Sequence, residues 1–138
     1  MAAIRIKTFT LRWGPTLLMM GLIFLFSSIP MKPQLPSAGL PKLDWLTLIR
    51  KGGHLLGYAL LALALQHGLR LKGWQGVAAI LCCVLLYALS DEFHQSFVLG
   101  RSARLTDVGI DLLGGILGLV VARTLGKVLN DVVTHSKP

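Results

Sequence analysis

Residues 74–125, WQGVAAILCCVLLYALSDEFHQSFVLGRSARLTDVGIDLLGGILGLVVARTL, contain two long apolar runs separated by one polar stretch. The runs, residues 74–89 and 108–125, are almost uncharged, whereas residues 90–107 hold acids, a histidine, an amide and two arginines. About 20 residues of apolar helix cross the roughly 30 Å of bilayer hydrocarbon. This stretch therefore predicts two transmembrane helices joined by a polar connection.

Two further apolar runs precede this stretch, at residues 13–29 and 52–69. Of the 138 residues, 54% are hydrophobic and only 14% are charged, whereas a soluble domain carries about 25% charged residues. We therefore expect an all-α fold, a polytopic membrane protein with four transmembrane helices in a compact antiparallel bundle. The expected single domain covers residues 1–138, with spans at about 13–29, 52–69, 74–92 and 107–125 and a solvated, loosely ordered tail at 126–138.

The connections between the runs carry their own signals. Residues 30–48 contain four prolines and predict a loop. Residues 70–73 form a short basic turn that makes spans two and three antiparallel neighbours, and Gly100 predicts a turn after span three. A basic start before an apolar run could also be a signal peptide, but a retained first helix is preferred because the rest of the chain also spans the membrane.

The formal charge of +8 lies almost entirely between the apolar runs, which is typical of topology signals and of contact with anionic lipid. We therefore expect membrane lipids as partners and no nucleic acid. With four spans, one side holds eight Lys and Arg residues and the other six. The positive-inside rule then favours a cytoplasmic location for both termini.

Four antiparallel spans bring the start of span two, the end of span three and the start of span four to one membrane face, which the end of span one also reaches. Charged groups beside bilayer-length apolar segments are costly to bury, so their convergence indicates a functional site. The polar residues that can meet there are Ser27, Ser28, Arg50, Lys51, His54, Tyr58, Asp91, Glu92, His94, Gln95, Arg101, Arg104, Asp107 and Asp111.

Three interpretations of this cluster remain open. It could be a structural network of ion pairs and hydrogen bonds, a catalytic site with a general base near an anion-binding arginine, or a recognition site without chemistry. Transport by a monomer is disfavoured, because the inner halves of the spans are nearly free of polar residues. The candidate catalytic residues are His54, Asp91, Glu92 and Asp107. The candidate substrate-binding residues are Lys51, Tyr58, Gln95, Arg101 and Asp111.

A metal site is a weaker hypothesis. The side chains with suitable ligand atoms are His54, Glu92, His94, Asp107 and Asp111. They lack a tight spacing such as H-E-x-x-H, so we expect no metal and no cofactor. We expect His94 to be an exposed loop histidine.

Glycines spaced four apart predict close helix packing. Gly53 and Gly57 in span two, and Gly114 and Gly118 in span four, form small-x-x-x-small faces. Packing of spans two and four through such faces would bring His54 toward Asp111. Homo-oligomerisation through one of these faces is the competing interpretation.

These residues also resemble a known family. Lys51, His54, Gly57 and Tyr58 are followed by Asp91-Glu92-x-x-Gln95-x-Phe97, Gly100-Arg101 and Asp107. This pattern resembles the VanZ family of small bacterial membrane proteins over roughly residues 20–122, and Ser27-Ser28-x-Pro30 is similar too. Two positions depart from the family pattern: Leu99 stands where many members have proline, and Asp111 where many have asparagine.

The resemblance implies a multi-pass protein of the bacterial inner membrane with a link to the cell envelope, because the founding member is associated with teicoplanin resistance. The topology puts the polar site at the outer face, and at that depth in the membrane we expect a lipid-linked or anionic envelope ligand. Most members have no assigned biochemical activity, so the resemblance does not decide whether the chain is an enzyme.

Overall fold

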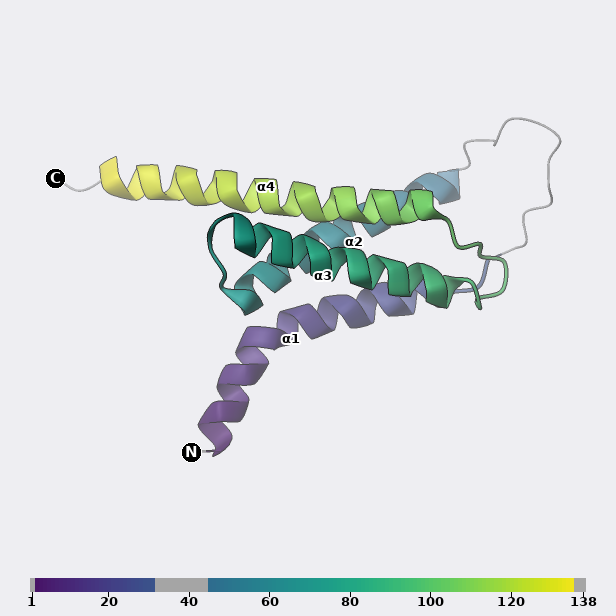
Figure 1. Ribbon diagram of the computed structural model, residues 1–138, viewed down its shortest axis with the longest axis horizontal. Coiled ribbons are helices and arrows are strands. Elements are labelled where there is room, and N and C mark those ends of the chain that lie inside the picture. The colour runs from purple at the N-terminus through teal and green to yellow at the C-terminus, as the bar shows by residue number, and fades with distance from the viewer. Residues whose placement is uncertain (1, 32–44, 136–138) are drawn as a thin grey trace.

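The computed structural model describes residues 2–31 and 45–135, and this part of the chain is all helical. Its helices are α1 (Ala2–Ser27), α2 (Trp45–Leu69), α3 (Gly73–Gln95) and α4 (Leu105–His135) (Figure 1). Each contains a segment long and apolar enough to cross a membrane, within Ile6–Ser27, Trp45–Leu69, Gly73–Gln95 and Leu105–Val128. The all-α, four-span prediction is confirmed for the described residues.

The helices are longer than the expected spans. α1 begins at Ala2 and not near residue 13, and α2 begins at Trp45, so residues 45–48 of the expected loop are helical. Residues 126–135, expected as a loose tail, continue α4. The apolar runs mark only the part of a helix that matches the hydrocarbon, and the helix continues through flanking residues that contain no proline to interrupt it. The loop prediction for residues 32–44 lies outside the described residues.

α1 is bent, and its N-terminal half leans away from the other helices (Figure 1). Pro15 lies inside this helix, where a proline removes one backbone hydrogen bond and its ring clashes with the preceding turn, so it kinks the helix. α1 meets the bundle from Arg12 onward, where Arg12 Nε donates to the Gly68 carbonyl oxygen of α2 at 2.6 Å.

α2 is the central helix, because it makes the most extensive contacts with α1 and α4, while α3 packs against α2, α4 and, least extensively, α1. The approach of α4 is closest at two glycines: a Cβ atom at Gly114 would collide with the Leu55 carbonyl oxygen, and one at Gly118 with that of Ala59. The small-x-x-x-small prediction for span four is thus confirmed within one chain. Since α2 covers this face, it is not available for homo-oligomerisation.

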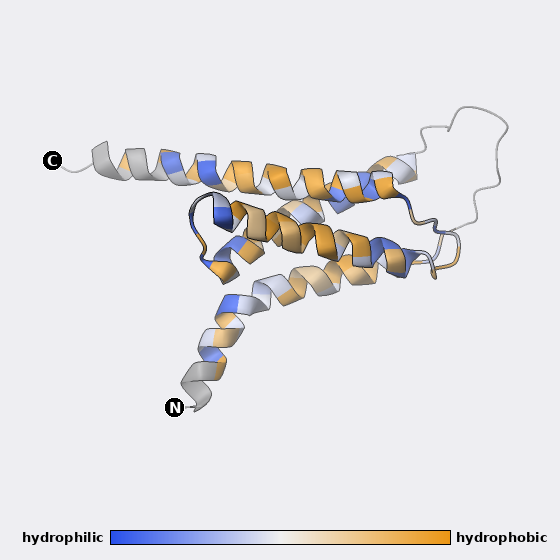
Figure 2. Cartoon of the chain, viewed as in Figure 1, coloured by the Kyte–Doolittle hydropathy of each residue, from blue (hydrophilic) through white to orange (hydrophobic). Residues whose placement is uncertain are grey.

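Apolar side chains are divided between a narrow core and the outside of the bundle. The core includes the fully buried Tyr58, Ala62, Val84 and Ala88. Large apolar residues such as Leu18 remain exposed along the helices, as expected where the surroundings are lipid and not water. Figure 2 shows the hydrophobic middle of the bundle and the hydrophilic end where α1 and α3 finish and α2 and α4 begin.

The connection between α3 and α4 closes this polar end. Gly100 has a φ of +78°, a conformation that favours glycine, and a Cβ atom there would collide with the Met31 carbonyl. The Met31 backbone N–H donates to the Leu99 carbonyl oxygen at 3.0 Å. The predicted turn at Gly100 is therefore confirmed, and it ties the end of α1 to the α3–α4 connection.

We predict that Gly114→Ala or Gly118→Ala destabilises the protein by about 1–3 kcal/mol, the usual cost of overpacking, because the added methyl group meets an α2 carbonyl oxygen. The measurement is the midpoint of thermal unfolding of the purified protein in mild detergent. Gly109→Ala is the matched control on the same helix, since a Cβ atom there meets nothing within 4 Å. A Gly118→Ala protein that melts like Gly109→Ala would contradict the packing described here.

Candidate functional site

The polar end of the bundle holds two layers of ionisable side chains. The inner layer is the buried cluster of His54, Asp91 and Asp111, one residue each from α2, α3 and α4. The outer layer is the cationic rim of Arg50 and Lys51, which contacts Asp107 at the start of α4. The convergence of these helix ends follows from the antiparallel arrangement, as the sequence predicted.

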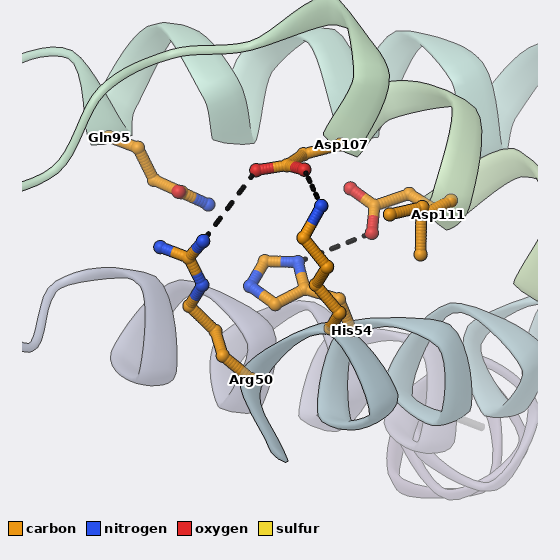
Figure 3. Close-up of a pocket in the computed structure, with 7 residues that line it drawn as sticks. Arg50, His54, Gln95, Asp107 and Asp111 are labelled. Atoms are coloured by element: carbon orange, nitrogen blue, oxygen red, sulfur yellow. Dashed lines mark hydrogen bonds and ion pairs between the residues drawn. The ribbon is translucent and has the colours of Figure 1, made fainter. Parts of the chain in front are cut away.

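His54 and Asp111 form the first contact of the buried cluster. The His54 Nδ1 atom lies 3.2 Å from Asp111 Oδ1 (Figure 3). Asp111 is completely buried, and the His54 side chain is 14% exposed. Gly114 lies about one helical turn beyond Asp111, so the close approach of α4 to α2 brings Asp111 into contact with His54. The expected meeting of His54 and Asp111 is confirmed.

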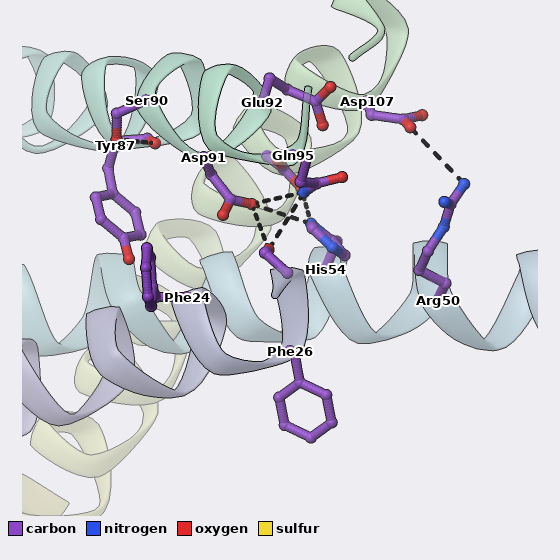
Figure 4. A network of polar contacts seen from close by, with 12 residues as sticks. Phe24, Phe26, Arg50, His54, Tyr87, Ser90, Asp91, Glu92, Gln95 and Asp107 are labelled. Carbon is purple, nitrogen blue, oxygen red and sulfur yellow. Dashed lines mark hydrogen bonds and ion pairs between the residues drawn. The ribbon is translucent and has the colours of Figure 1, made fainter. Parts of the chain in front are cut away.

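Asp91 is the second carboxylate of the buried cluster. Its Oδ2 atom accepts hydrogen bonds from the Ser27 hydroxyl at 2.8 Å and from Gln95 Nε2 at 2.9 Å, and it lies 3.9 Å from His54 Nδ1 (Figure 4). Gln95 Nε2 also donates to the Ser27 oxygen at 3.2 Å. Asp91 and Gln95 share a helix face at i,i+4, and Ser27 fixes the carboxylate from α1.

The cationic rim lies outside the buried cluster. Lys51 Nζ is 3.1 Å from Asp107 Oδ1, and Arg50 Nη2 is 3.9 Å from Asp107 Oδ2. A small pocket opens between the two layers (Figure 3). Its lining residues are Arg50, Lys51, His54, Gln95, Asp107, Ile110 and Asp111.

Two residues expected in the site hold helix ends in place. Glu92 Oε2 accepts the Arg104 backbone N–H at 2.6 Å, just before α4 begins. Arg101 donates to the carbonyl oxygens of Phe26 and Ile29 at 2.7 and 3.2 Å. Backbone groups at helix ends lack intrahelical partners, so these bonds satisfy the start of α4 and the end of α1. Lys51 is paired with an acid, whereas Arg101 binds backbone oxygens.

The environment of Arg101 changes its acidity. Desolvation by burial, and then the positive charge of Arg50, lower the pKa of the guanidinium from its ordinary value, while Asp91 and Glu92 oppose this shift. An arginine nevertheless remains protonated in proteins. Arg101 is therefore a permanent positive charge behind the cluster.

Tyr58 forms the inner boundary of the cluster. It is fully buried one turn along α2 from His54, and the two rings are nearly parallel with centroids 6.3 Å apart. Its other face meets the Tyr87 ring at 6.1 Å. Tyr58 thus separates the polar end from the apolar core.

His94 differs from its expectation. It lies in the last turn of α3, half-buried, with its ring stacked on Phe24 at 4.3 Å and Nε2 3.0 Å from the Ser28 hydroxyl. The interpretation as an exposed loop histidine is wrong, because α3 continues through Gln95 and turns this side chain toward α1.

Sequence reasoning placed Ser27 and Arg50 near this face but did not include them among the site residues. Ser27 is completely buried against Asp91, and Arg50 lines the pocket. Two signals pointed to them: the end of span one reaches the polar face, and Arg50 precedes His54 by four residues on one helical face.

The arrangement supports two kinds of chemistry. A histidine against a buried carboxylate can transfer a proton. The ligand atoms of His54, Asp91 and Asp111 all lie within 4.8 Å of one another, so the same three residues could hold a metal ion. Glu92, His94 and Asp107 do not belong to this group.

Comparison with known proteins gives a family. The model of the VanZ/LLP1 family matches residues 13–126, a range that includes every residue of the buried cluster and the cationic rim. No curated protein and no solved structure matches the chain. The chain is a multi-pass membrane protein, and it belongs to the VanZ/LLP1 family.

Proposed function

We propose that this VanZ-family protein binds or modifies a lipid or cell-wall-related component of the bacterial envelope at its polar end. The observation that carries the proposal is the burial of Asp91 and Asp111 around His54, whose side chain is 14% exposed, beneath a pocket lined by Arg50 and Lys51. Ionisable groups in membrane-spanning helices are expensive and mark functional sites by default. The energetic cost of placing these ionisable groups in the bundle is therefore an argument for a functional role.

The cationic rim supports an anionic ligand group. Arg50 and Lys51 face one carboxylate, Asp107, and their side chains are 22% and 35% exposed. Two cations against one acid leave a net positive charge at the mouth of the pocket, which favours a phosphate or carboxylate headgroup. The headgroup would lie at the rim, with its acyl or polyprenyl chain against the exposed apolar faces of the helices.

The buried cluster would act on a group held at the rim. His54 and Asp111 line the pocket, so a bound headgroup would meet them directly, and Asp91 would orient His54 from the other side. In this proposal His54 is the acid–base group, and Lys51 and Arg50 bind the ligand. Gln95 and Tyr58 shape the site, while Glu92 and Arg101 position its helices.

The envelope role also depends on topology. The positive-inside excess on the side of the termini supports a cytoplasmic location for both ends, which puts the polar end at the outer face of the inner membrane. A ligand there would belong to the outer leaflet or to a lipid-linked wall precursor. An effect on teicoplanin susceptibility is the corresponding phenotype.

A structural network is the second candidate function. Its support is that several charges are already satisfied: Asp107 by Lys51, Glu92 by the Arg104 N–H, and Arg101 by carbonyl oxygens of α1. In this alternative the cluster holds helix ends together and has no ligand.

The first prediction concerns ligand binding at the rim. We expect the Arg50→Gln/Lys51→Gln protein to bind phosphatidylglycerol about 30-fold more weakly than the wild type, from roughly 1 kcal/mol per cation near a membrane surface. The measurement is native mass spectrometry in mild detergent, with phosphatidylglycerol added and phosphatidylcholine as the neutral comparison. Arg70→Gln is the control, since it removes an exposed arginine at the opposite end of the bundle. Equal retention by all proteins would contradict a headgroup site at the rim.

The second prediction separates function from structure. Asp91→Asn keeps a side chain of the same size whose oxygen can still accept from Ser27 and Gln95 but removes the acid, so we expect it to fold with little change in melting temperature. Expressed at a matched membrane level in a teicoplanin-sensitive bacterium, it should lose the effect on the inhibitory concentration that the wild type confers, while His67→Gln keeps it. A variant that retains the full effect, or that loses it only with a lowered melting temperature, would favour the structural network.

A further inference from the structure

The charges of the polar end are unevenly balanced. Asp107 faces Arg50 and Lys51, and Glu92 accepts a backbone N–H. Among the described residues neither Asp91 nor Asp111 forms an ion pair with a lysine or arginine, because Arg101, the positive charge behind the cluster, donates to carbonyl oxygens of α1. The two aspartates share one histidine as their direct partner, at 3.9 and 3.2 Å from its Nδ1 atom. Two carboxylates in the interior of an apolar bundle require positive charge close by. A single imidazole can balance at most one of them.

The same three side chains have the chemistry of a metal site. They offer one imidazole nitrogen and two carboxylate oxygens, a donor set that suits zinc, iron and manganese. The ligand atoms lie within 4.8 Å of one another, and the 3.2 Å contact already matches the spacing of about 3.3 Å between ligands of a tetrahedral ion with bonds near 2.0 Å.

Buried oxygen atoms in this region also lack partners. Among the described residues, five side-chain atoms at the polar end are buried without a hydrogen bond: Asp91 Oδ1, Asp111 Oδ2, the Tyr58 hydroxyl, Glu92 Oε1 and Arg101 Nη1. Tyr58 is fully buried and lies within electrostatic range of both carboxylates. Buried polar atoms are normally satisfied by protein, water or an ion. The unpartnered phenol and carboxylate oxygens therefore point to a bound species in the cluster.

Neighbouring side chains orient Asp91 by hydrogen bonds, as residues around a metal site orient its ligands. Ser27 and Gln95 both donate to Asp91 Oδ2 and fix the carboxylate, which leaves Oδ1 for coordination. Hydrogen bonds of this kind orient the ligands of metal sites. The three ligands come from three separate helices, so an ion would also join α2, α3 and α4.

We propose that His54, Asp91 and Asp111 bind one divalent transition-metal ion. The inference deepens the proposed function, and the role of the ion rests on that function. His54 and Asp111 also line the pocket below the cationic rim, so the ion would lie beside the proposed ligand. A phosphate or carboxylate held by Arg50 and Lys51 would face the ion, which would act as a Lewis acid or as an anchor for the headgroup.

The test is metal content. The wild type, His54→Gln and Asp111→Asn are purified in mild detergent, stripped with EDTA, reloaded with Zn²⁺ or Mn²⁺, separated from free ion and measured by plasma mass spectrometry. We expect about one equivalent in the wild type and at least a tenfold loss of affinity in both variants. His67→Gln is the matched control, because it removes a histidine from the other end of the same helix and should bind like the wild type.

A second measurement covers variants that fold poorly. Co²⁺ added to the stripped wild type should give visible d–d absorption bands, and one equivalent of Zn²⁺ should abolish them. Ser27→Ala should weaken metal binding by about 10- to 100-fold, as substitution of other residues that orient metal ligands does. A wild type that retains neither Zn²⁺ nor Mn²⁺ and shows no Co²⁺ bands would overturn the inference. So would equal loss in His67→Gln and His54→Gln. Lipid retention by the stripped protein tests the headgroup site separately, because the cationic rim needs no metal.

Discussion

The close approach of α4 to α2 is the constraint on which the polar end depends. Gly114 and Gly118 place the α4 backbone against the carbonyl oxygens of Leu55 and Ala59. In lipid, where apolar contact gives little net driving force between helices, such approach gains dispersion energy that larger side chains would prevent. It also fixes the distance between His54 and Asp111, whose contact at 3.2 Å lies about one turn from the first glycine.

Burial at the cluster is tolerated because the polar groups occupy the end of the bundle and are joined across all four helices. Ser27 comes from α1, His54 from α2, Asp91 and Gln95 from α3, and Asp111 from α4. A buried polar network stabilises a unique packing only when its members are satisfied. Here one oxygen of each aspartate and the phenol of Tyr58 have no partner among the described residues, and neither do Glu92 Oε1 and Arg101 Nη1 beside them. The polar end therefore retains unsatisfied groups that a bound species could meet.

The two layers of the polar end differ in charge and in exposure to solvent. The rim of Arg50 and Lys51 is partly exposed and carries the positive charge that an anionic group would meet. The cluster beneath is nearly closed to solvent, so its electrostatic interactions are stronger than they would be in water. Arg101 and Glu92 lie behind both layers and tie the ends of α1 and α4 to the site through backbone groups. In the proposed function the rim recognises a headgroup and the cluster below it holds the reactive groups.

The sequence by itself determined the number of spans, their antiparallel order and the face at which the polar residues meet, because apolar run length and the placement of charge depend only on composition along the chain. It also predicted the turn at Gly100, the glycine contact of span four and the meeting of His54 with Asp111. The tertiary structure decided the partners: Arg101 binds carbonyl oxygens of α1, His94 stacks on Phe24, and Ser27 holds Asp91. Helical spacing gives the face of a side chain but not the rotation and depth of the neighbouring helix, and these depend on packing between residues far apart in the chain.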